Sequence, residues 1–551
     1  MAAKRRAPST PSSIRRSTPS STPTREAIRP VTVRSIALAR HPRVRAAGPA
    51  ARATYEGMTM SPALGASLPG GRAVRPNLVL AICCMSLLVV AMDATIVNVA
   101  LPAIRRDLSA SISGLQWVID AYTMVVASLF LLSGSLADRF GRRRVFQTGM
   151  LVFTLASALC SVAPGLNALI AFRVLQAAGA SMLNPVAMSI ITNTFVDPKA
   201  RARAIGVWGA MFGIAMALGP LVGGSLTQLI GWRSIFWINL PIGAITIALA
   251  QGFVPESRAP RARRFDPIGQ LLVVTALFAL VYAIIEGPRH GWYSPLIIAL
   301  FAVSAGAVIG IVRYEPRRDE PLLDLRFFRS VPFASATVIA VCMFGAFAGF
   351  LFLNALYLQD TRAQSALTAG LTTMPLALAT VAFAPISGRL VGRHGTRPSL
   401  VLAGLAIATS GVMLTSLTAA TPLPWLIAAY AIFGIGFGLA NPPITTTAVS
   451  GMPRTQAGVA AAVASTSRQI GASLGVALGG TIASTASRGA AAQFAGATHA
   501  FWWLAAGAGA AISVLGVAST GAAARASVGR IAALLDDAPA PAAQAQAQAR
   551  T

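Results

Sequence analysis

Residues 134–144 read GSLADRFGRRR, and residues 388–397 read GRLVGRHGTR. The two stretches agree at five of ten aligned positions without a gap, and each lies at the end of a long apolar run. A second match pairs Asn184-Pro185 with Asn441-Pro442. Internal repeats of this kind are found in membrane proteins whose two related halves enclose a site near the middle of the bilayer. The repeat therefore predicts two equivalent halves that can alternate in access.

The whole chain contains about fourteen apolar runs, and the two repeated stretches lie at the ends of two of them. A transmembrane helix needs about 20 consecutive apolar residues. Of the 551 residues, 55% are hydrophobic and only 11% are charged, whereas a soluble globular protein carries about 25% charged residues. We therefore expect an all-α integral membrane protein whose spans occupy residues 78–101, 115–137, 145–163, 166–190, 205–229, 235–253, 267–285, 295–312, 332–356, 367–391, 400–417, 423–446, 458–482 and 501–518.

The repeat also divides the chain into segments. If the ninth span corresponds to the first, six spans are followed by two additional ones and then by six more. We expect an N-terminal six-helix half in residues 77–254, two additional helices with their linkers in 255–330, and a C-terminal six-helix half in 331–519.

The two ends of the chain differ from the spans in composition. Residues 1–76 are rich in Ser, Thr, Pro and Arg and lack the apolar core of a secretory signal, which predicts a disordered basic tail. Met1 is one possible start of the chain, and Met58 or Met60 are the others. Residues 520–551 end in repeated Ala and Gln, and we expect a low-complexity tail there.

The net charge of +28 has a simple distribution along the chain. The first 77 residues hold 14 Lys and Arg against two acids, and most other cations lie in every second loop. The intervening loops are nearly free of cations, with Arg105 and Arg106 as the clearest exception. Lys and Arg in short loops favour the cytoplasmic side. We therefore expect a multi-pass protein of the inner (cytoplasmic) membrane with both termini in the cytoplasm, and no nucleic-acid partner.

Several motifs in a fixed order give the chain a family resemblance. They are DATIVNVALP at 93–102, GSLADRFGRRR at 134–144, RVLQAAG at 173–179, GIAMALGPLVGG at 213–224 and RQIG at 468–471. With them, the chain resembles the major facilitator superfamily over residues 78–518, and within it the fourteen-span drug:proton antiporter family. The resemblance implies the major facilitator fold and the export of lipophilic drugs or related small molecules from the cytoplasm in exchange for protons.

Two charged residues stand inside apolar spans. An ionised side chain inside the bilayer costs about 2.5–3.5 kcal/mol on insertion scales, so Asp93 and Arg173 each need a partner or water. The resemblance implies that they form the proton-coupling site. A static hydrogen-bonded Asp93 and a purely structural Arg173 are the alternatives. Asp120 and Arg468 stay open as further members of the coupling site; Arg468 either faces the cavity or extends to the cytoplasmic interface.

A second set of residues is implied to control the conformational change. Glycines in the fifth span let a neighbouring helix approach closely, and the proline among them bends the helix, although ordinary tight packing explains the glycines equally well. The loop at 134–144 is implied to be a latch, with simple anchoring of the cations as the alternative. The candidates are Gly134, Asp138, Arg139, Gly141, Arg142, Gly213, Gly219, Pro220, Gly223 and Gly224.

The substrate is expected in an apolar, aromatic pocket between the halves. Any single aromatic or Met on a membrane helix can instead face lipid or a neighbour. The last six spans contain no Asp or Glu before Asp360, which lies in a loop, and none follows until Asp536, so monovalent or neutral amphiphiles fit better than dications. The candidate pocket residues are Tyr122, Met124, Gln176, Trp208, Met211, Phe212, Phe350 and Asn354.

The energy source is expected to be an ion gradient. The chain has no Gly-x4-Gly-Lys-Ser/Thr loop for a nucleotide phosphate. Its four Cys and four His are scattered, so we expect no metal site, no cofactor and no catalytic residues. The expected partners are small lipophilic substrates, protons and the lipid bilayer. The sequence does not decide whether an envelope adaptor takes part. A proton-coupled transporter of a specific metabolite, exporter or symporter, is the alternative function; a membrane-embedded enzyme or sensor fits less well.

Overall fold

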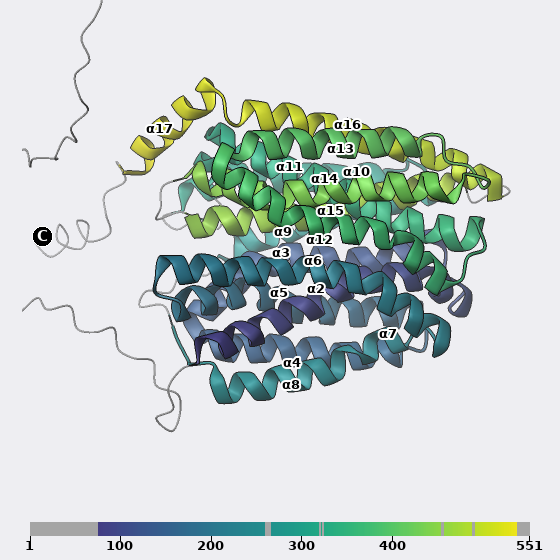
Figure 1. The fold of residues 1–551 in the computed structure, drawn as a ribbon, viewed down its shortest axis with the longest axis horizontal. Helices are drawn as coiled ribbons and strands as arrows, with labels where there is room; N and C mark the ends of the chain where they lie inside the picture. The colour runs from purple at the N-terminus through teal and green to yellow at the C-terminus, as the bar shows by residue number, and fades with distance from the viewer. Residues whose placement is uncertain are drawn as a thin grey trace, which may run out of the picture. The chain divides into compact units, whose positions relative to one another are not determined.

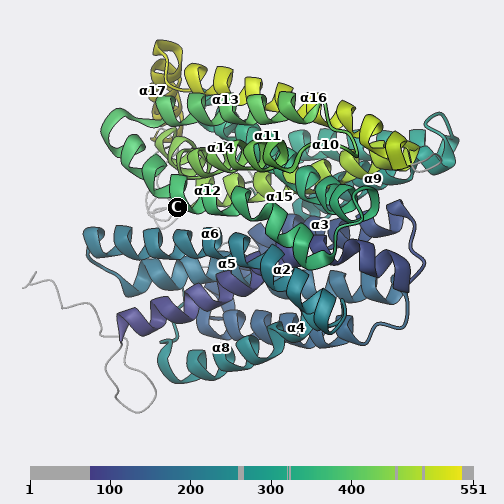
Figure 2. The same cartoon turned by 45° about the vertical axis from the view of Figure 1, so that its right-hand side comes forward.

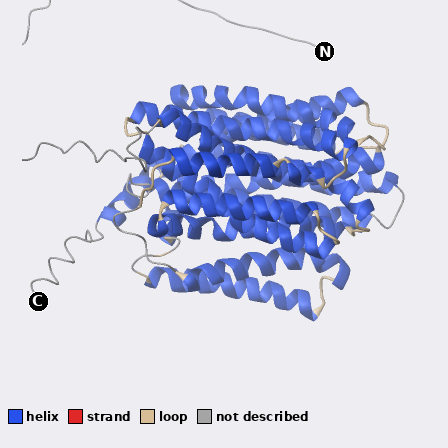
Figure 3. Cartoon of the chain, turned by 90° about the horizontal axis from the view of Figure 1, so that it is seen from below, coloured by secondary structure: helices blue, strands red, loops and turns tan. Residues whose placement is uncertain are grey.

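The computed structural model describes residues 75–258, 266–318, 321, 324–452, 457–486 and 491–536. Within these ranges the chain is helical and contains no strand (Figure 3). The basic tail predicted for residues 1–76 lies outside the described residues, apart from its last two.

The helices fall into two groups, purple to teal and green to yellow in Figure 1, with α9 and α10 between them in sequence. The first group contains α2 (Pro76–Asp107), α3 (Ile112–Phe140), α4 (Arg142–Ser161), α5 (Leu166–Thr194), α6 (Pro198–Leu229), α7 (Ser234–Trp237) and α8 (Asn239–Phe253). Next come α9 (Pro267–His290), α10 (Pro295–Tyr314) and the short turns η1 (Glu315–Arg317) and η2 (Leu325–Arg329). The second group contains α11 (Val331–Leu356), η3 (Tyr357–Thr361), α12 (Ala366–His394), α13 (Thr396–Leu414), α14 (Leu423–Ser450), α15 (Ala457–Ala486) and α16 (Ala491–Ala518), and α17 (Ala522–Asp536) follows.

Thirteen of the described helices are long and apolar enough to cross a membrane. The sequence predicts about fourteen, and α15 accounts for the difference. This 30-residue helix contains Arg468, Gln469 and many Gly, Ser and Thr residues, which lower its hydropathy. It packs against α3, α9, α11, α14 and α16. Because protein surrounds it and its Gly471 and Gly475 touch the backbone of α11, close packing takes the place of a lipid-facing apolar surface.

The two halves repeat one another in their packing. In the first half α2 packs on α6, and α5 packs on α3 and α4. In the second half α11 packs on α15, and α14 packs on α12 and α13. The halves meet through two equivalent helix pairs, α6 with α12 and α3 with α15 (Figure 2). The internal repeat read from the sequence is therefore a repeat of structure.

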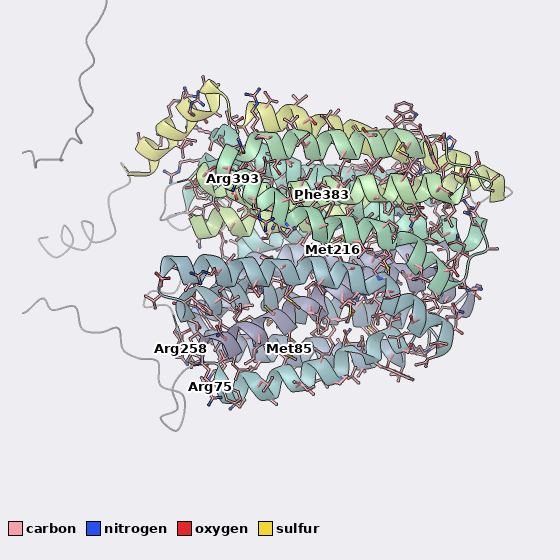
Figure 4. All side chains as sticks on the ribbon, in the orientation of Figure 1. Arg75, Met85, Met216, Arg258, Phe383 and Arg393 are labelled. Carbon is pink, nitrogen blue, oxygen red and sulfur yellow. The ribbon has the colours of Figure 1, made fainter. Side chains whose placement is uncertain are left out.

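Polar contacts between the halves gather at one end of the bundle. Arg75, Arg258 and Arg393 lie together at the other end, here named the arginine-rich end (Figure 4). Among the described residues, no hydrogen bond or ion pair joins the halves there. At the opposite, arginine-poor end, Arg105 Nη1 lies 3.1 Å from Asp360 Oδ2.

Three glutamines extend this contact, which we call the outer seam. Gln359 Nε2 donates to the Val99 carbonyl at 2.8 Å, and Gln116 Nε2 donates to the Ala477 carbonyl at 2.8 Å. Gln228 Oε1 accepts from the Leu367 backbone nitrogen at 3.2 Å. The halves are thus joined by hydrogen bonds at the arginine-poor end.

The two additional helices, α9 and α10, lie along one side of the boundary between the halves. Helix α9 contacts both α3 and α15, and α10 packs on α9. Gln270 of α9 donates to the Ser128 carbonyl of α3, and Thr481 of α15 donates to the Ile284 carbonyl of α9 at 2.8 Å. Helix α9 therefore bridges the two halves.

Helix α17 occupies part of the range for which the sequence predicts a low-complexity tail. Its Ile531 is buried in a cluster with Phe327 and Phe333, and its Ser527 Oγ accepts from the Val331 backbone nitrogen at 3.0 Å. Only one face of α17 is apolar, so the segment does not look like a span, yet it can dock on the arginine-rich end of the C-terminal half. Residues 537–551 lie outside the described part of the chain.

Candidate transport site

Asp93 lies in the middle of α2 and is fully buried. Each of its carboxylate oxygens accepts hydrogen bonds. Arg173 Nη1 donates to Oδ2 at 2.6 Å, while Gln176 Nε2 and Asn239 Nδ2 donate to Oδ1 at 2.9 Å and 3.2 Å. The carboxylate is therefore held by three donors from α5 and α8, and one of them carries the opposite charge.

Arg173 is the centre of the same network. Its Nη1 also donates to Gln176 Oε1 at 2.7 Å, and its Nε donates to the Val118 carbonyl of α3 at 3.2 Å. The guanidinium lies 4.1 Å from the ring centroid of Tyr122, a cation–π distance. Arg173 and Gln176 are three residues apart on α5, so both project from one face of that helix. This spacing is why the RVLQ motif delivers two groups to one carboxylate.

Two further members of the network have no charge. Ser157 Oγ accepts from Gln176 Nε2 at 2.7 Å and from Asn239 Nδ2 at 3.2 Å. Sequence reasoning gave neither Ser157 nor Asn239 a role. For Ser157 the only signal was a polar residue within an apolar run, which is frequent in this chain. Asn239 begins the stretch NLP at 239–241, which also fits the family resemblance but carried no role.

The loop between α3 and α4 is tied to the end of α8. Gly141 has a φ of +107°, which a side chain would strain, and it allows α4 to begin at once. Asp138 pairs with Arg142 at 2.9 Å within the motif. Glu256 accepts from the Arg143 backbone nitrogen at 3.1 Å, and its second oxygen lies 3.8 Å from Arg144.

The latch candidates thus contact their own half. Glu256 is a member that the sequence analysis missed; its signal was an acid in a cationic loop, the same signal that singled out Asp138. Of the remaining candidates in the motif, Gly134 has open space where a Cβ would lie, and Arg139 lies over the Phe140 ring.

The glycines of α6 divide between two neighbours. A Cβ on Gly219 or Gly223 would collide with Thr95 or Ile96 of α2, the turn directly after Asp93. A Cβ on Gly224 would lie 2.6 Å from the Ala366 carbonyl of α12. At the same level the Pro220 carbonyl lies against Gly370 of α12, whereas a Cβ on Gly213 would make only ordinary contact, 3.5 Å from Val381. Gly219, Pro220, Gly223 and Gly224 therefore bring α6 against both α2 and the other half.

The candidate pocket residues do not gather in one place. Tyr122 and Gln176 belong to the Asp93 network described above. Met124 of α3 packs against α9 and α15. Trp208, Met211 and Phe212 of α6 pack around Leu87, Ala91 and Met92 of α2. Phe350 lies inside the C-terminal half, against Tyr430, Phe433 and Trp502.

A small cavity of about 10 Å³ lies between the halves near the outer seam. Asn98 of α2, Pro220 of α6, Asn354 of α11 and Thr373 of α12 line it, so Asn354 is the pocket candidate that reaches it. The Asn354 amide donates to Thr373 Oγ1 at 3.1 Å. The cavity is about the size of one water molecule. The halves are thus closely packed at this level.

Asp120 and Arg468, left open by the sequence, are not exposed at the membrane surface. Asp120 is fully buried on α3 beside Ser473 of α15 and accepts from Thr123 Oγ1 at 3.3 Å. Arg468 of α15 donates to Thr445 Oγ1 of α14 at 2.6 Å. Neither joins the Asp93 network.

The fold and these motifs match known proteins. The family model described as Major Facilitator Superfamily matches residues 83–476. The chain is 37% identical over 399 residues to the multidrug resistance protein Stp of Mycobacterium tuberculosis, covering 72% of this chain and 74% of that protein. It is 37% identical over 405 residues to the puromycin resistance protein pur8 of Streptomyces alboniger, covering 73% of this chain and 80% of that protein.

Solved structures agree on the fold. The crystal structure of the peptide transporter POT in complex with sulfate superposes with a TM-score of 0.61 at 16% identity, covering 85% of this chain and 98% of that one. Similarity at this identity concerns the fold alone. The chain belongs to the major facilitator superfamily, and it is a multi-pass membrane transporter rather than an enzyme.

Proposed function

We propose that the chain exports small lipophilic molecules from the cytoplasm in exchange for protons, and that Asp93 carries the proton. The observation behind this proposal is the carboxylate of Asp93, fully buried in the bundle and held by Arg173, Gln176 and Asn239. The similarity to proteins named for multidrug and puromycin resistance supports drugs as the exported molecules. The arginine-rich end faces the cytoplasm in this proposal, in accord with the distribution of cations.

The network makes protonation of Asp93 a structural event. All three contacts are donated to the carboxylate, so a protonated Asp93 would carry an O–H donor that faces other donors. Of the amide oxygens in the network, Gln176 Oε1 is already bonded to Arg173, and Asn239 Oδ1 belongs to an amide whose nitrogen donates to Asp93. Protonation also removes the negative charge that balances Arg173, and an uncompensated buried charge is costly. A proton on Asp93 therefore favours a rearrangement of α2 against α5 and α8.

The end of the bundle at which the two halves are hydrogen-bonded indicates which state of the transport cycle this structure represents. The hydrogen bonds of the outer seam close the arginine-poor end, which in this proposal is the outer end. The structure then corresponds to the state that takes up substrate from the cytoplasm. Proton uptake at Asp93 from the outside requires the other state, in which the outer seam is broken. A proton entering the cell gains about 2.3 kcal/mol per 100 mV of membrane potential, and this drives the exchange.

The test is drug-triggered proton release from energised inside-out vesicles, followed with a pH-sensitive acridine dye. Vesicles with the wild-type protein should lose part of their pH gradient when puromycin or another lipophilic drug of a panel is added. Asp93→Asn should abolish the response while the protein remains in the membrane. Asp197→Asn is the matched control, because exposed Asp197 caps α6 and Asn caps equally well.

Each outcome decides between functions. If Asp93→Asn releases protons as the wild type does, Asp93 is a structural residue and the coupling proposal is wrong. If the wild type responds only to a single metabolite and to none of the drugs, the chain is a specific metabolite transporter.

A further inference from the structure

Arg468 is an unusual residue of the C-terminal half. Between Arg397 and Arg525 the sequence contains no Asp, Glu or Lys, and its only other arginines are Arg454 and Arg488 at the two ends of the α15 segment. Arg468 is the twelfth residue of α15, so its Cα lies about 17 Å along the helix from the arginine-rich end. It is therefore the only Arg, Lys, Asp or Glu within α14, α15 and α16.

The guanidinium is held in place without an acid. Nη2 donates to Thr445 Oγ1 at 2.6 Å, and Nη1 lies 3.5 Å from Ser465 Oγ. The group lies 5.7 Å from the centroid of the Phe344 ring. Its Nε is buried and has no hydrogen-bond partner, and none of the carboxylates in the described ranges lies within ion-pair distance of Arg468.

The contrast with Arg173 shows what is missing. In the N-terminal half the buried guanidinium of Arg173 is neutralised by Asp93 at 2.6 Å. In the C-terminal half Arg468 has only hydroxyl partners, and a buried cation without a counter-charge is unfavourable. The residue as a whole is half-buried, while its Nε is enclosed by protein.

The surroundings of Arg468 are aromatic. Phe344 packs against Phe437 with ring centroids 5.2 Å apart, and Phe347 packs on the same ring of Phe437 at 4.3 Å. These rings come from α11 and α14, the helices that also contact α15. A cation, two hydroxyl groups and an aromatic cluster together suit a molecule with an anionic group and an aromatic body.

We propose that Arg468 binds the anionic group of aromatic amphiphilic substrates, such as a carboxylate, sulfonate or phenolate. The proposal rests on the export function proposed above and narrows its substrate class. The alternative is a purely structural Arg468 that links α14 to α15 through Thr445. A structural role would affect all ligands alike, whereas a charge-binding role affects anions selectively.

The test measures equilibrium binding of matched probes to the purified full chain in lipid nanodiscs. Dansylglycine, dansylglycinamide and dansylcadaverine share one aromatic body and carry an anionic, a neutral and a cationic end. The wild type should bind dansylglycine about 10- to 100-fold more tightly than dansylglycinamide, as a charge-assisted hydrogen bond predicts. Arg468→Gln should bring this ratio to about one and leave the affinity for dansylglycinamide unchanged.

Two further variants complete the design. Arg468→Lys keeps the charge and should retain part of the preference for dansylglycine. Arg389→Gln removes an exposed arginine of the same half and should keep the full preference. If Arg468→Gln does not fold, Thr445→Val provides a second test, because it removes the hydroxyl that orients the guanidinium and should lower the ratio.

The outcomes separate this proposal from the export proposal, since binding requires no proton gradient. A wild type without preference for dansylglycine overturns the anion site, as does an Arg468→Gln variant that keeps the preference. An equal loss of affinity for all three probes would show that Arg468 is structural. Failure of drug-triggered proton release with an intact binding preference would refute export and leave the anion site standing.

Discussion

At the scale of single residues, Arg173 connects four groups of the proton-coupling candidate site. Its guanidinium contacts Asp93, Gln176, the Val118 carbonyl and the Tyr122 ring. A lysine ammonium is a point charge on a flexible stem and cannot make the planar, forked contacts of a guanidinium.

We predict that Arg173→Lys lowers drug-triggered proton release at least about tenfold, with the protein still inserted, because Lys can keep the charge but not the geometry. Inside-out vesicles and an immunoblot for the amount of protein measure both quantities. Arg389→Lys, at an exposed position of α12, should have no effect. A lysine variant with wild-type release would mean that charge alone is sufficient at this position.

At the scale of residues, the sequence could predict the charged members of the candidate site but not the uncharged ones. Asp93 and Arg173 could be singled out because ionised residues are rare within apolar runs. Ser157 and Asn239 could not, because uncharged polar residues occur throughout the spans and only the fold brings these two to Asp93. The pocket candidates were chosen by residue type, and type does not reveal whether an aromatic such as Phe350 faces a cavity or a helix.

At the scale of elements, the contact between α2 and α6 depends on the absence of side chains. We predict that Gly219→Ala destabilises the protein by about 1–3 kcal/mol, because the added methyl group would collide with Thr95 and Ile96 next to the Asp93 turn. Thermal unfolding of the purified protein measures this.

Gly209→Ala on the same helix is the control. No atom lies within 4 Å of the position of its Cβ, so this variant should be as stable as the wild type or slightly more stable. Equal losses in both variants would point to helix flexibility rather than packing as the reason for the glycines.

Helix α17 allows a second test at this scale. We predict that Ile531→Asp detaches α17 and speeds tryptic cleavage after exposed Arg525 about tenfold or more, because the carboxylate would be buried among Phe327 and Phe333. Leu534 is exposed on the same helix, and Leu534→Asp should be cleaved at the wild-type rate. Equal cleavage of both variants would contradict docking through Ile531.

The helices that could be predicted from the sequence are those that hydropathy alone identifies as membrane spans. The long apolar runs predicted the spans, but α17 was missed because its single apolar face is short and its neighbouring residues are repetitive. Helix α15 was expected as an apolar run at 458–482, and the structure explains why it is less apolar than a lipid-facing span: its surroundings are protein.

At the scale of the whole molecule, the proposed transport cycle requires the outer seam to open once in each turn. We predict that cross-linking Arg105→Cys to Asp360→Cys with a short bifunctional thiol reagent abolishes transport, because these positions lie on opposite halves. The matched control is the pair Arg233→Cys and Asp107→Cys. Its parent residues also form an ion pair at the arginine-poor end, but both lie in the N-terminal half, so the same cross-link should leave transport intact.

The sequence could predict that two halves exist, since the repeat fixes which helices correspond. It could not predict which end is closed, because one sequence must be compatible with both states of the cycle. The Arg105–Asp360 pair joins residues 255 positions apart. The sequence marks Arg105 as an exception among the cation-poor loops and Asp360 as an isolated acid, but nothing in it pairs the two. A structure of one state is needed to find such a pair.

The outer seam has one more consequence, which concerns how such a protein can evolve. Gln116, Gln228 and Gln359 bond to main-chain atoms of the other half, and every residue except proline offers both a carbonyl and an N–H group. The side chains of Val99, Leu367 and Ala477 can therefore be exchanged by mutation without loss of the partner atom. Closure of the arginine-poor end is in this way insulated from changes at these three positions, and Val99, which lines the small cavity between the halves, can change while the seal is inherited.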